Sequence, residues 1–339
     1  FASASGGNST RGSLTPALIA ALRAASRIRE SADSIEVVVI SPFVREETDA
    51  ATPAVRALLP GRLRTVRVAA SQGDASATDR AITPVIKWAD SSATNLWVKR
   101  AVIDTMSDLM ERSYANVHRG LHTLANETTD AYEAARRAVQ GLIKAASVNE
   151  VVFTHGTTES INLVASGVGQ SIQPGDEVIV SQMEHHANIV PWHFLRERLG
   201  AVLRFVPVTD DGRLDMEAYF GLLGPRTRMV ALTHMSNVLG TINPAKAIVE
   251  AAHAAGVPVL LDGAQAIVHL EVDVQDLDVD FYAFSGHKLY GPTGVGVLYG
   301  KAERLAALPP YQGGGEMIGE VSEEAITYAD PPHRFEAVT

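Results

Sequence analysis

The sequence predicts an α/β fold in which a mainly parallel, seven-stranded sheet carries helices on both faces. From about residue 84 onward, short runs of β-branched and aliphatic residues alternate with amphipathic stretches of helical spacing. Several of the strand-like runs end directly in polar or glycine-rich turns. Such alternation is typical of βαβ units, whose parallel strands place ligands at their carboxyl ends.

The first 82 residues predict a separate α/β-like extension that ends in a polar linker, and we assign no function to it. Its β-branched and helically spaced runs are too few to complete a sheet. The expected elements are a helix over residues 14–28, a strand over 35–40, a helix over 52–59, a strand over 63–69 and the linker over 71–81.

Residues 83–339 predict one large domain that contains the seven-stranded sheet. It begins with two long amphipathic helices, over residues 97–110 and 128–146. Strand-like runs then alternate with helical stretches to the end of the domain. The predicted strands cover residues 150–154, 177–181, 203–206, 227–233, 257–261, 281–285 and 295–299.

Composition narrows the classes of protein to which the chain can belong. Of its 339 residues, 46% are hydrophobic, which is enough for a large buried core. A net charge of −10 argues against broad binding of nucleic acid or anionic membranes, and no apolar run is long enough to span a bilayer. The absence of cysteine excludes disulfides, thiolate-bound zinc and a cysteine nucleophile. Because Phe1 opens no signal-peptide pattern, we expect a cytoplasmic chain cut from something longer.

Lys288 is the strongest candidate for a catalytic residue. It follows the aromatic-rich run 281–285 and lies in the turn Gly286-His287-Lys288-Leu289-Tyr290-Gly291. A single exposed lysine usually contributes only to solubility, but a lysine at the end of a buried strand faces a crevice. Schiff-base chemistry requires an amine whose charged form is disfavoured, next to a buried cofactor.

Asp262 lies 26 residues before Lys288 and directly follows the hydrophobic run Val259-Leu260-Leu261. An acid at such a position is most often a helix N-cap, and it can also bind a metal. In a pyridoxal enzyme, a carboxylate here keeps the pyridine nitrogen protonated, so that the ring acts as an electron sink. Gln265 would then donate to the phenolate oxygen of the cofactor.

Three further strand exits carry polar groups. Thr157 and Thr158 begin a helix, where backbone N–H groups bind phosphate, although an ordinary helix cap gives the same pattern. His185 has no second cluster of ligands around it, so we expect no metal there. We favour a catalytic ring that stacks on a planar cofactor and can also shuttle protons. Asn237 would orient the phenolate oxygen or the substrate, or belong to a simple turn.

Together, these exits give roughly residues 86–338 a resemblance to a known family. The segment 285–294 resembles the pyridoxal-lysine motif of class V aminotransferase-fold enzymes, in particular the group II cysteine desulfurases and selenocysteine lyases. The segments 116–122, 184–192 and 313–318 are similar to further signatures of that group.

The resemblance implies a fold-type I pyridoxal-phosphate enzyme that forms a homodimer and converts L-cysteine or L-selenocysteine to alanine. It also implies a sulfur-acceptor protein and a role in iron–sulfur cluster assembly. Lys288 would hold the cofactor and move the α-proton, and His185 would stack on its ring. The other implied contacts are Asp262, Gln265 and Asn237 at the ring and Thr157, Thr158, Ser285 and His287 at the phosphate.

The chain departs from the family pattern at both ends. Residues 1–82 match no part of it, and Val338 stands where the family has glycine. The chain ends before the small carboxyl-terminal domain in which the family carries its persulfide-forming Cys and the Arg that binds the substrate carboxylate. We therefore expect impaired desulfuration. The alternatives are a cysteine-independent lyase, epimerase or transaminase of the same fold, and a non-catalytic pyridoxal-binding fragment.

Overall fold

The computed structural model describes residues 36–41, 62–67, 100–118 and 122–337. The chain divides into two compact units, Phe1–Ala93 and Thr94–Thr339. In the first unit, β1 (Glu36–Ser41) and β2 (Arg62–Arg67) pair in parallel, which confirms the two strands predicted there. The other predicted elements of this unit, over residues 14–28, 52–59 and 71–81, lie outside the described residues, as does Val338.

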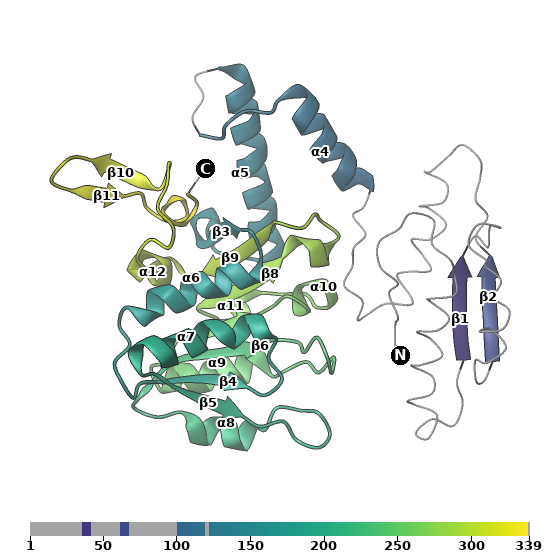
Figure 1. Cartoon of the computed structure of the whole chain (residues 1–339), viewed down its shortest axis with the longest axis vertical. Helices are drawn as coiled ribbons and strands as arrows, with labels where there is room; N and C mark the ends of the chain where they lie inside the picture. Colours follow the sequence, from purple (N-terminus) through teal and green to yellow (C-terminus); the bar gives the residue numbers. More distant parts are fainter. Residues whose placement is uncertain (1–35, 42–61, 68–99, 119–121, 338–339) are drawn as a thin grey trace. The chain divides into compact units, whose positions relative to one another are not determined.

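The second unit is built on one seven-stranded sheet with the strand order β3-β9-β8-β7-β6-β4-β5 (Figure 1). β9 is antiparallel to both neighbours, and the other pairs are parallel. Each strand overlaps a predicted one, so the mainly parallel sheet is confirmed. The strands are β3 (Val151–Thr154), β4 (Glu177–Ser181), β5 (Val202–Val206), β6 (Thr227–Thr233), β7 (Val259–Asp262), β8 (Phe281–Ser285) and β9 (Gly296–Gly300).

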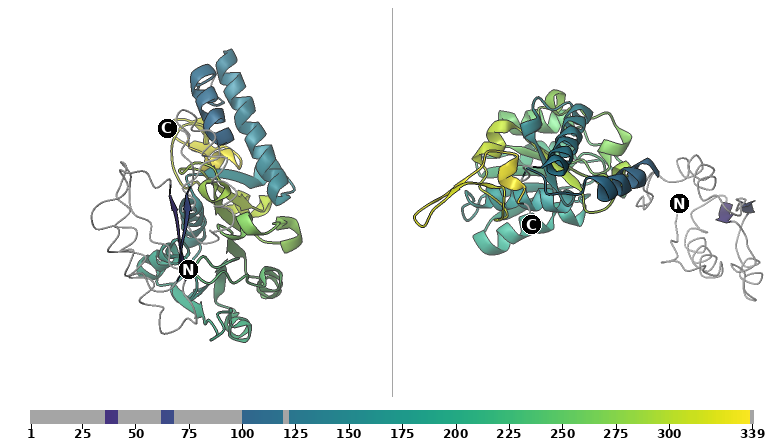
Figure 2. Two further views of the ribbon diagram at one scale, coloured as in Figure 1. Left: turned by 90° about the vertical axis from the view of Figure 1, so that its right-hand side faces the viewer. Right: turned by 90° about the horizontal axis from the view of Figure 1, so that it is seen from above.

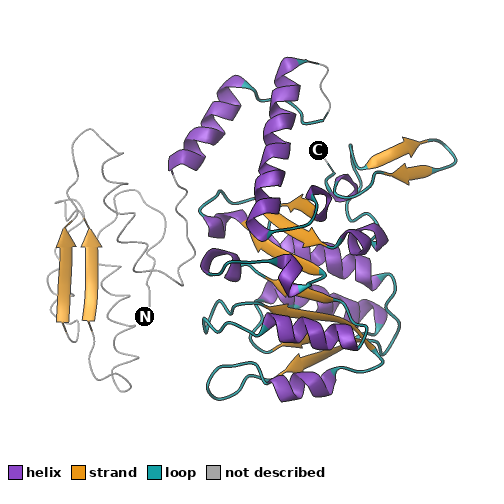
Figure 3. Cartoon of the chain, turned by 180° about the vertical axis from the view of Figure 1, so that it is seen from behind, coloured by secondary structure: helices purple, strands orange, loops and turns teal. Residues whose placement is uncertain are grey.

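Helices cover both faces of this sheet, as the sequence predicted, and Figure 3 shows the arrangement from behind. Successive strand residues point to opposite faces, so Leu260 packs in one hydrophobic cluster and Leu261 in the other. One cluster includes α6 (Thr157–Gly169), α7 (Val190–Leu199) and α12 (Ala302–Ala307). The other includes α8 (Met216–Leu222), α9 (Ala245–Ala254), α10 (Ala266–His269) and α11 (Val274–Leu277).

Two helices precede the sheet, and a hairpin follows it. α4 (Arg100–Arg112) and α5 (Thr123–Ile143) extend beyond the body of the sheet (Figure 2). α5 begins five residues earlier than predicted because the ring of His122 caps it by accepting from the Ala125 backbone N–H. β10 (Ile318–Val321) and β11 (Ile326–Tyr328) form an antiparallel hairpin. None of the described helices is long and apolar enough to cross a membrane.

An ion pair from distant parts of the chain closes the free edge of β3. The Arg136 guanidinium donates to both carboxylate oxygens of Glu336, at 2.7 and 2.8 Å, and to the backbone oxygen of Val151 at 2.7 Å. Glu336 also accepts from the backbone N–H of Phe153 at 2.6 Å. β3 is an edge strand, so no neighbouring strand is available to its outer backbone groups. The ion pair forms hydrogen bonds with two of them instead, the Val151 oxygen and the Phe153 N–H.

We expect Arg136→Met to destabilise the second unit by about 3–5 kcal/mol, because it leaves the Glu336 carboxylate, only 8% exposed, without its cation. The measurement is the free energy of unfolding in urea. The neighbouring, exposed Arg137 provides the control, since Arg137→Met should change stability little. Equal effects of the two substitutions would show that the ion pair does not stabilise the edge.

Candidate active site

The carboxyl ends of the parallel strands meet at one edge of the sheet, where the predicted site residues lie. Thr233 at the end of β6 is the register partner of Asp262 at the end of β7. Asp262 in turn is paired with Ala283 of β8, two residues before Ser285. Parallel pairing thus brings segments that are far apart in sequence into one row, as the sequence analysis expected of a ligand site.

Asp262 and Lys288 interact electrostatically across this row. Asp262 is buried, and burial raises the pKa of its carboxyl group, while the N–H of Ala264 and the charges of Lys288 and His185 lower it. Burial lowers the pKa of the Lys288 ammonium, and the Asp262 carboxylate opposes that change. The site therefore contains an amine that is more easily deprotonated than a surface lysine, next to a buried acid.

Ser285 and Thr157 join the end of β8 to the start of α6. The Ser285 hydroxyl accepts from the backbone N–H of Thr157 at 2.9 Å and is hydrogen-bonded to its hydroxyl at 2.7 Å. The backbones also approach closely here, since a Cβ on Gly296 would lie 2.4 Å from the Cα of Gly156. The first N–H groups of a helix have no acceptor within the helix, so this corner can bind an anion.

Within the described part of the chain, the other predicted site residues make fewer hydrogen bonds to one another than Ser285 and Thr157 make. His287 is next to Lys288, and burial together with the Lys288 charge lowers its pKa. Thr158 and His185 are exposed, and the ring of His185 accepts from the N–H of Ala187 at 3.1 Å. Asn237 lies in the turn after β6, and Gln265 immediately precedes α10. In the described residues, neither side chain is hydrogen-bonded to another predicted site residue.

Three buried polar residues behind this row were missed by the sequence analysis. Glu184 is hydrogen-bonded to the ends of β4 and β6, and burial raises the pKa of its carboxyl group to about 8. The hydroxyl of Tyr282 is 3.0 Å from Nδ1 of His234, and burial lowers the pKa of that imidazole to about 4. A Cβ on Gly263 would lie 2.0 Å from the Tyr282 ring, so only glycine fits after Asp262.

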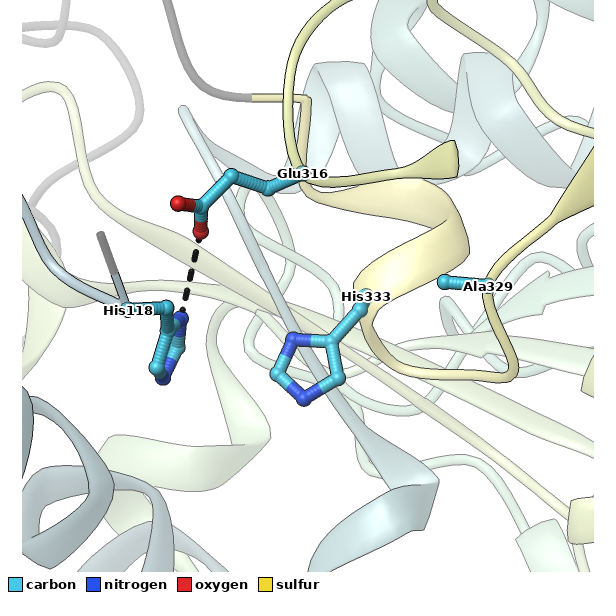
Figure 4. Close-up of a pocket in the computed structure, with 4 residues that line it drawn as sticks. All are labelled: His118, Glu316, Ala329 and His333. Atoms are coloured by element: carbon cyan, nitrogen blue, oxygen red, sulfur yellow. Dashed lines mark ion pairs between the residues drawn. The ribbon is translucent and has the colours of Figure 1, made fainter. Parts of the chain in front are cut away.

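A hollow of about 410 Å³ is lined by His118, Glu316, Ala329 and His333 (Figure 4). His118 has a left-handed backbone, and its ring lies 3.3 Å from Glu316 and 3.1 Å from Glu133. The resemblance motifs at residues 116–122 and 313–318 thus contribute to the same hollow. Across the described residues, no group of three or more His, Asp and Glu side chains is placed to hold a metal ion.

Residues 87–339 match the model of the family described as aminotransferase class V. A cysteine desulfurase of Dickeya dadantii is 57% identical over 248 residues, which are 73% of this chain and 60% of that protein. Among solved structures, the cysteine desulfurase CsdA from Escherichia coli has a TM-score of 0.68 and 47% identity, over 74% of this chain and 63% of that one.

Another similar structure contains a cofactor. It is a lysine-to-alanine mutant of C-DES with glycine covalently linked to its pyridoxal-phosphate cofactor. It matches with a TM-score of 0.65 and 26% identity, over 77% of this chain and 69% of that chain. This chain therefore spans about 60% of the length of its cysteine desulfurase relative and somewhat more of the C-DES chains.

Proposed function

We propose, since this chain belongs to the class V aminotransferase family, that it binds pyridoxal 5′-phosphate and acts as a cysteine desulfurase-like enzyme. Its substrates would be L-cysteine or L-selenocysteine and its product alanine, with desulfuration of L-cysteine impaired because the chain contains no cysteine. The observation that carries the proposal is the arrangement of one sheet edge. Buried Asp262 ends β7, Lys288 directly follows the neighbouring strand β8, and the Ser285–Thr157 hydrogen bonds join β8 to the start of α6.

The donor and acceptor groups at this edge fit the parts of the proposed cofactor. Asp262 would hold a proton at the pyridine nitrogen, and Lys288 would bind the aldehyde carbon. Thr157, Thr158, Ser285 and His287 would hold the phosphate at the start of α6, where the helix favours negative charge. His185 would stack on the ring, and Asn237 and Gln265 would contact its phenolate side. When bound, pyridoxal phosphate supplies an electron sink for the bonds at the α-carbon.

The protein groups would manage the protons of the reaction. Because burial lowers the pKa of Lys288, a larger fraction of its amine is neutral and able to accept the α-proton. Asp262 is buried, and within the described part of the chain its carboxylate accepts one hydrogen bond, from the Ala264 backbone N–H, so it keeps acceptor capacity for the ring nitrogen. Lys288 would therefore accept and release the α-proton, whereas Asp262 would keep a proton in place at the ring nitrogen.

We further propose that the active form is a homodimer and that the sulfur passes to an acceptor protein. The exposed apolar side chains of the β10–β11 hairpin, Ile318, Val321, Ile326 and Tyr328, support an interface with another chain. The Dickeya dadantii relative is a cysteine desulfurase, which supports sulfur removal. An acceptor protein is proposed because the removed sulfur must be transferred to another molecule.

The chain contains no cysteine, so no thiolate of its own can attack the substrate sulfur. We expect negligible turnover of L-cysteine and weak turnover of L-selenocysteine, because selenium is expelled more easily than sulfur. The measurement is alanine release from both substrates under identical conditions, with pyridoxal phosphate saturating. Brisk turnover of L-cysteine would show that a cysteine of the chain itself is not needed.

The same absence of cysteine favours a second candidate, a carbon–sulfur lyase that needs no enzyme thiol. One similar structure, at 27% identity, is described as a cystine C–S lyase in complex with cysteine persulfide. The two candidates differ in their products, because a lyase releases pyruvate and ammonia from the carbon skeleton instead of alanine. Assaying pyruvate alongside alanine in the same incubation separates them.

A further inference from the structure

Glu184 is a buried acid that none of the assigned roles uses. It lies between the end of β4 and the 3₁₀ turn His186–Asn188, immediately before His185. Only 8% of its surface is exposed, which is unusual for a glutamate that has no cationic partner among the residues that the structure describes. A buried carboxyl group without a cation needs several hydrogen bonds to offset its lost hydration.

Three donors from three different segments meet at this carboxyl group. Oε1 accepts from the Ser181 hydroxyl at 2.5 Å and from the backbone N–H of Thr233 at 2.9 Å. Oε2 accepts from the side-chain amide of Asn188 at 2.7 Å. Ser181 ends β4, Thr233 ends β6, and Asn188 ends the turn that follows His185. One carboxyl group thus fixes the His185 turn to two strand ends.

The orientation of the Asn188 amide is itself fixed. Its oxygen accepts from the indole N–H of Trp192 at 3.1 Å, and both side chains are fully buried. An indole nitrogen can only donate, so the amide must present its NH₂ group to Glu184. Both carboxylate oxygens therefore face a donor that cannot accept, so a glutamine at position 184 would set its NH₂ group against that of Asn188 in one orientation and against the Thr233 N–H in the other.

The same carboxyl group is close to the proposed cofactor-binding residues. Thr233, which donates to Glu184, is the register partner of Asp262, and the charge of Asp262 contributes to raising the pKa of Glu184. His185 is the next residue in the chain, and its charge acts on Asp262. The hydrogen bonds of Glu184 therefore connect the His185 turn to the end of β6. His185 is proposed to stack on the cofactor ring, and β6 lies next to Asp262, which is proposed to bind the ring nitrogen.

We propose that Glu184 is a positioning residue that sets the ring of His185 and the end of β6 for the cofactor. The inference rests on the proposed function, since it assumes that pyridoxal phosphate occupies the edge around Lys288 and Asp262. Glu184 does not touch the cofactor in this proposal. It acts through the His185 turn and through the backbone of Thr233.

The test compares two variants that differ in hydrogen-bond complementarity between positions 184 and 188. Glu184→Gln sets its NH₂ group against a donor in either orientation of the amide. The double variant Glu184→Gln/Asn188→Asp keeps one carboxyl group in the network, exchanges donor and acceptor, and restores every hydrogen bond, including that of Trp192. We expect the single variant to bind pyridoxal phosphate about 10- to 100-fold more weakly, the range seen when a supporting hydrogen bond is lost around bound metals. The double variant should recover most of that affinity.

Two measurements separate positioning from general stability. The visible circular dichroism of the bound cofactor reports its asymmetric surroundings, and we expect Glu184→Gln to change it and the double variant to restore it. Urea unfolding of the cofactor-free proteins gives their stability. Glu177→Gln is the matched control, because Glu177 begins β4 and pairs with Arg204 at 2.6 Å, and it should leave the cofactor spectrum unchanged.

The outcomes distinguish this inference from the function on which it rests. If the unaltered chain takes up no pyridoxal phosphate, the proposed function is wrong, and the role of Glu184 falls with it. If the unaltered chain binds the cofactor and Glu184→Gln binds it with the same affinity and spectrum, only the role of Glu184 is overturned. Failure of the double variant to recover, with unfolding stability equal to that of the unaltered protein, also overturns it.

Discussion

Lys288→Ala should abolish covalent binding of pyridoxal phosphate, and with it the visible absorption band of the lysine–cofactor Schiff base. The physical reason is that Schiff-base formation needs a neutral amine, which burial favours at Lys288 by lowering its pKa. The alanine side chain offers no nitrogen, so the loss should be complete rather than partial. Reduction with borohydride followed by peptide mapping shows which lysine carries the cofactor.

A matched control for this experiment is Lys246→Ala. Lys246 is exposed and pairs with Asp276 at 2.6 Å, on α9 and α11, and removing it should leave cofactor uptake unchanged. A cofactor label on Lys246, or on any lysine other than Lys288, would show that the site assignment is wrong. Lys288→Ala could still take up pyridoxal phosphate that borohydride does not attach to any peptide. Such uptake is non-covalent and agrees with the assignment of Lys288.

Asp262→Asn should leave cofactor uptake intact but slow exchange of the substrate α-proton by about a hundred- to ten-thousand-fold, the usual effect of a positioned proton-transfer group. Asparagine cannot hold a proton at the pyridine nitrogen, so the ring would withdraw electrons less well. The side-chain oxygen of asparagine can still accept from Ala264, which preserves the turn. Exchange is measured by loss of the α-proton signal of the substrate in deuterated buffer.

The stability of the cofactor-free Asp262→Asn variant tests the simpler role of a helix cap. Burial raises the pKa of Asp262 in the folded state, so folding favours its protonated form, and stability is lost as pH rises through that raised pKa. The neutral asparagine avoids this loss, and the variant should therefore be at least as stable as the unaltered protein at neutral pH. Unchanged α-proton exchange in Asp262→Asn would mean that Asp262 only caps the turn.

Much of the fold could be predicted from the sequence because its signals are local. Each strand of the sheet is a short apolar run, and each predicted run overlaps an observed strand. The candidate site residues could be named for a similar reason, since they directly follow those runs within a few residues. The direction of β9 could not be predicted, because an apolar run that is buried on both faces looks the same in either direction.

The sequence by itself determined the fold class, the row of polar strand exits and the family to which residues 87–339 belong. Only the tertiary structure decided which distant groups meet: Ser285 with Thr157, Arg136 with Glu336, and Glu184 with Thr233. The physical reason is that these contacts depend on strand order and register, which residue periodicity does not specify. Glu184 illustrates the difference, because its place in the sequence does not reveal the three donors from three segments that surround its buried carboxyl group.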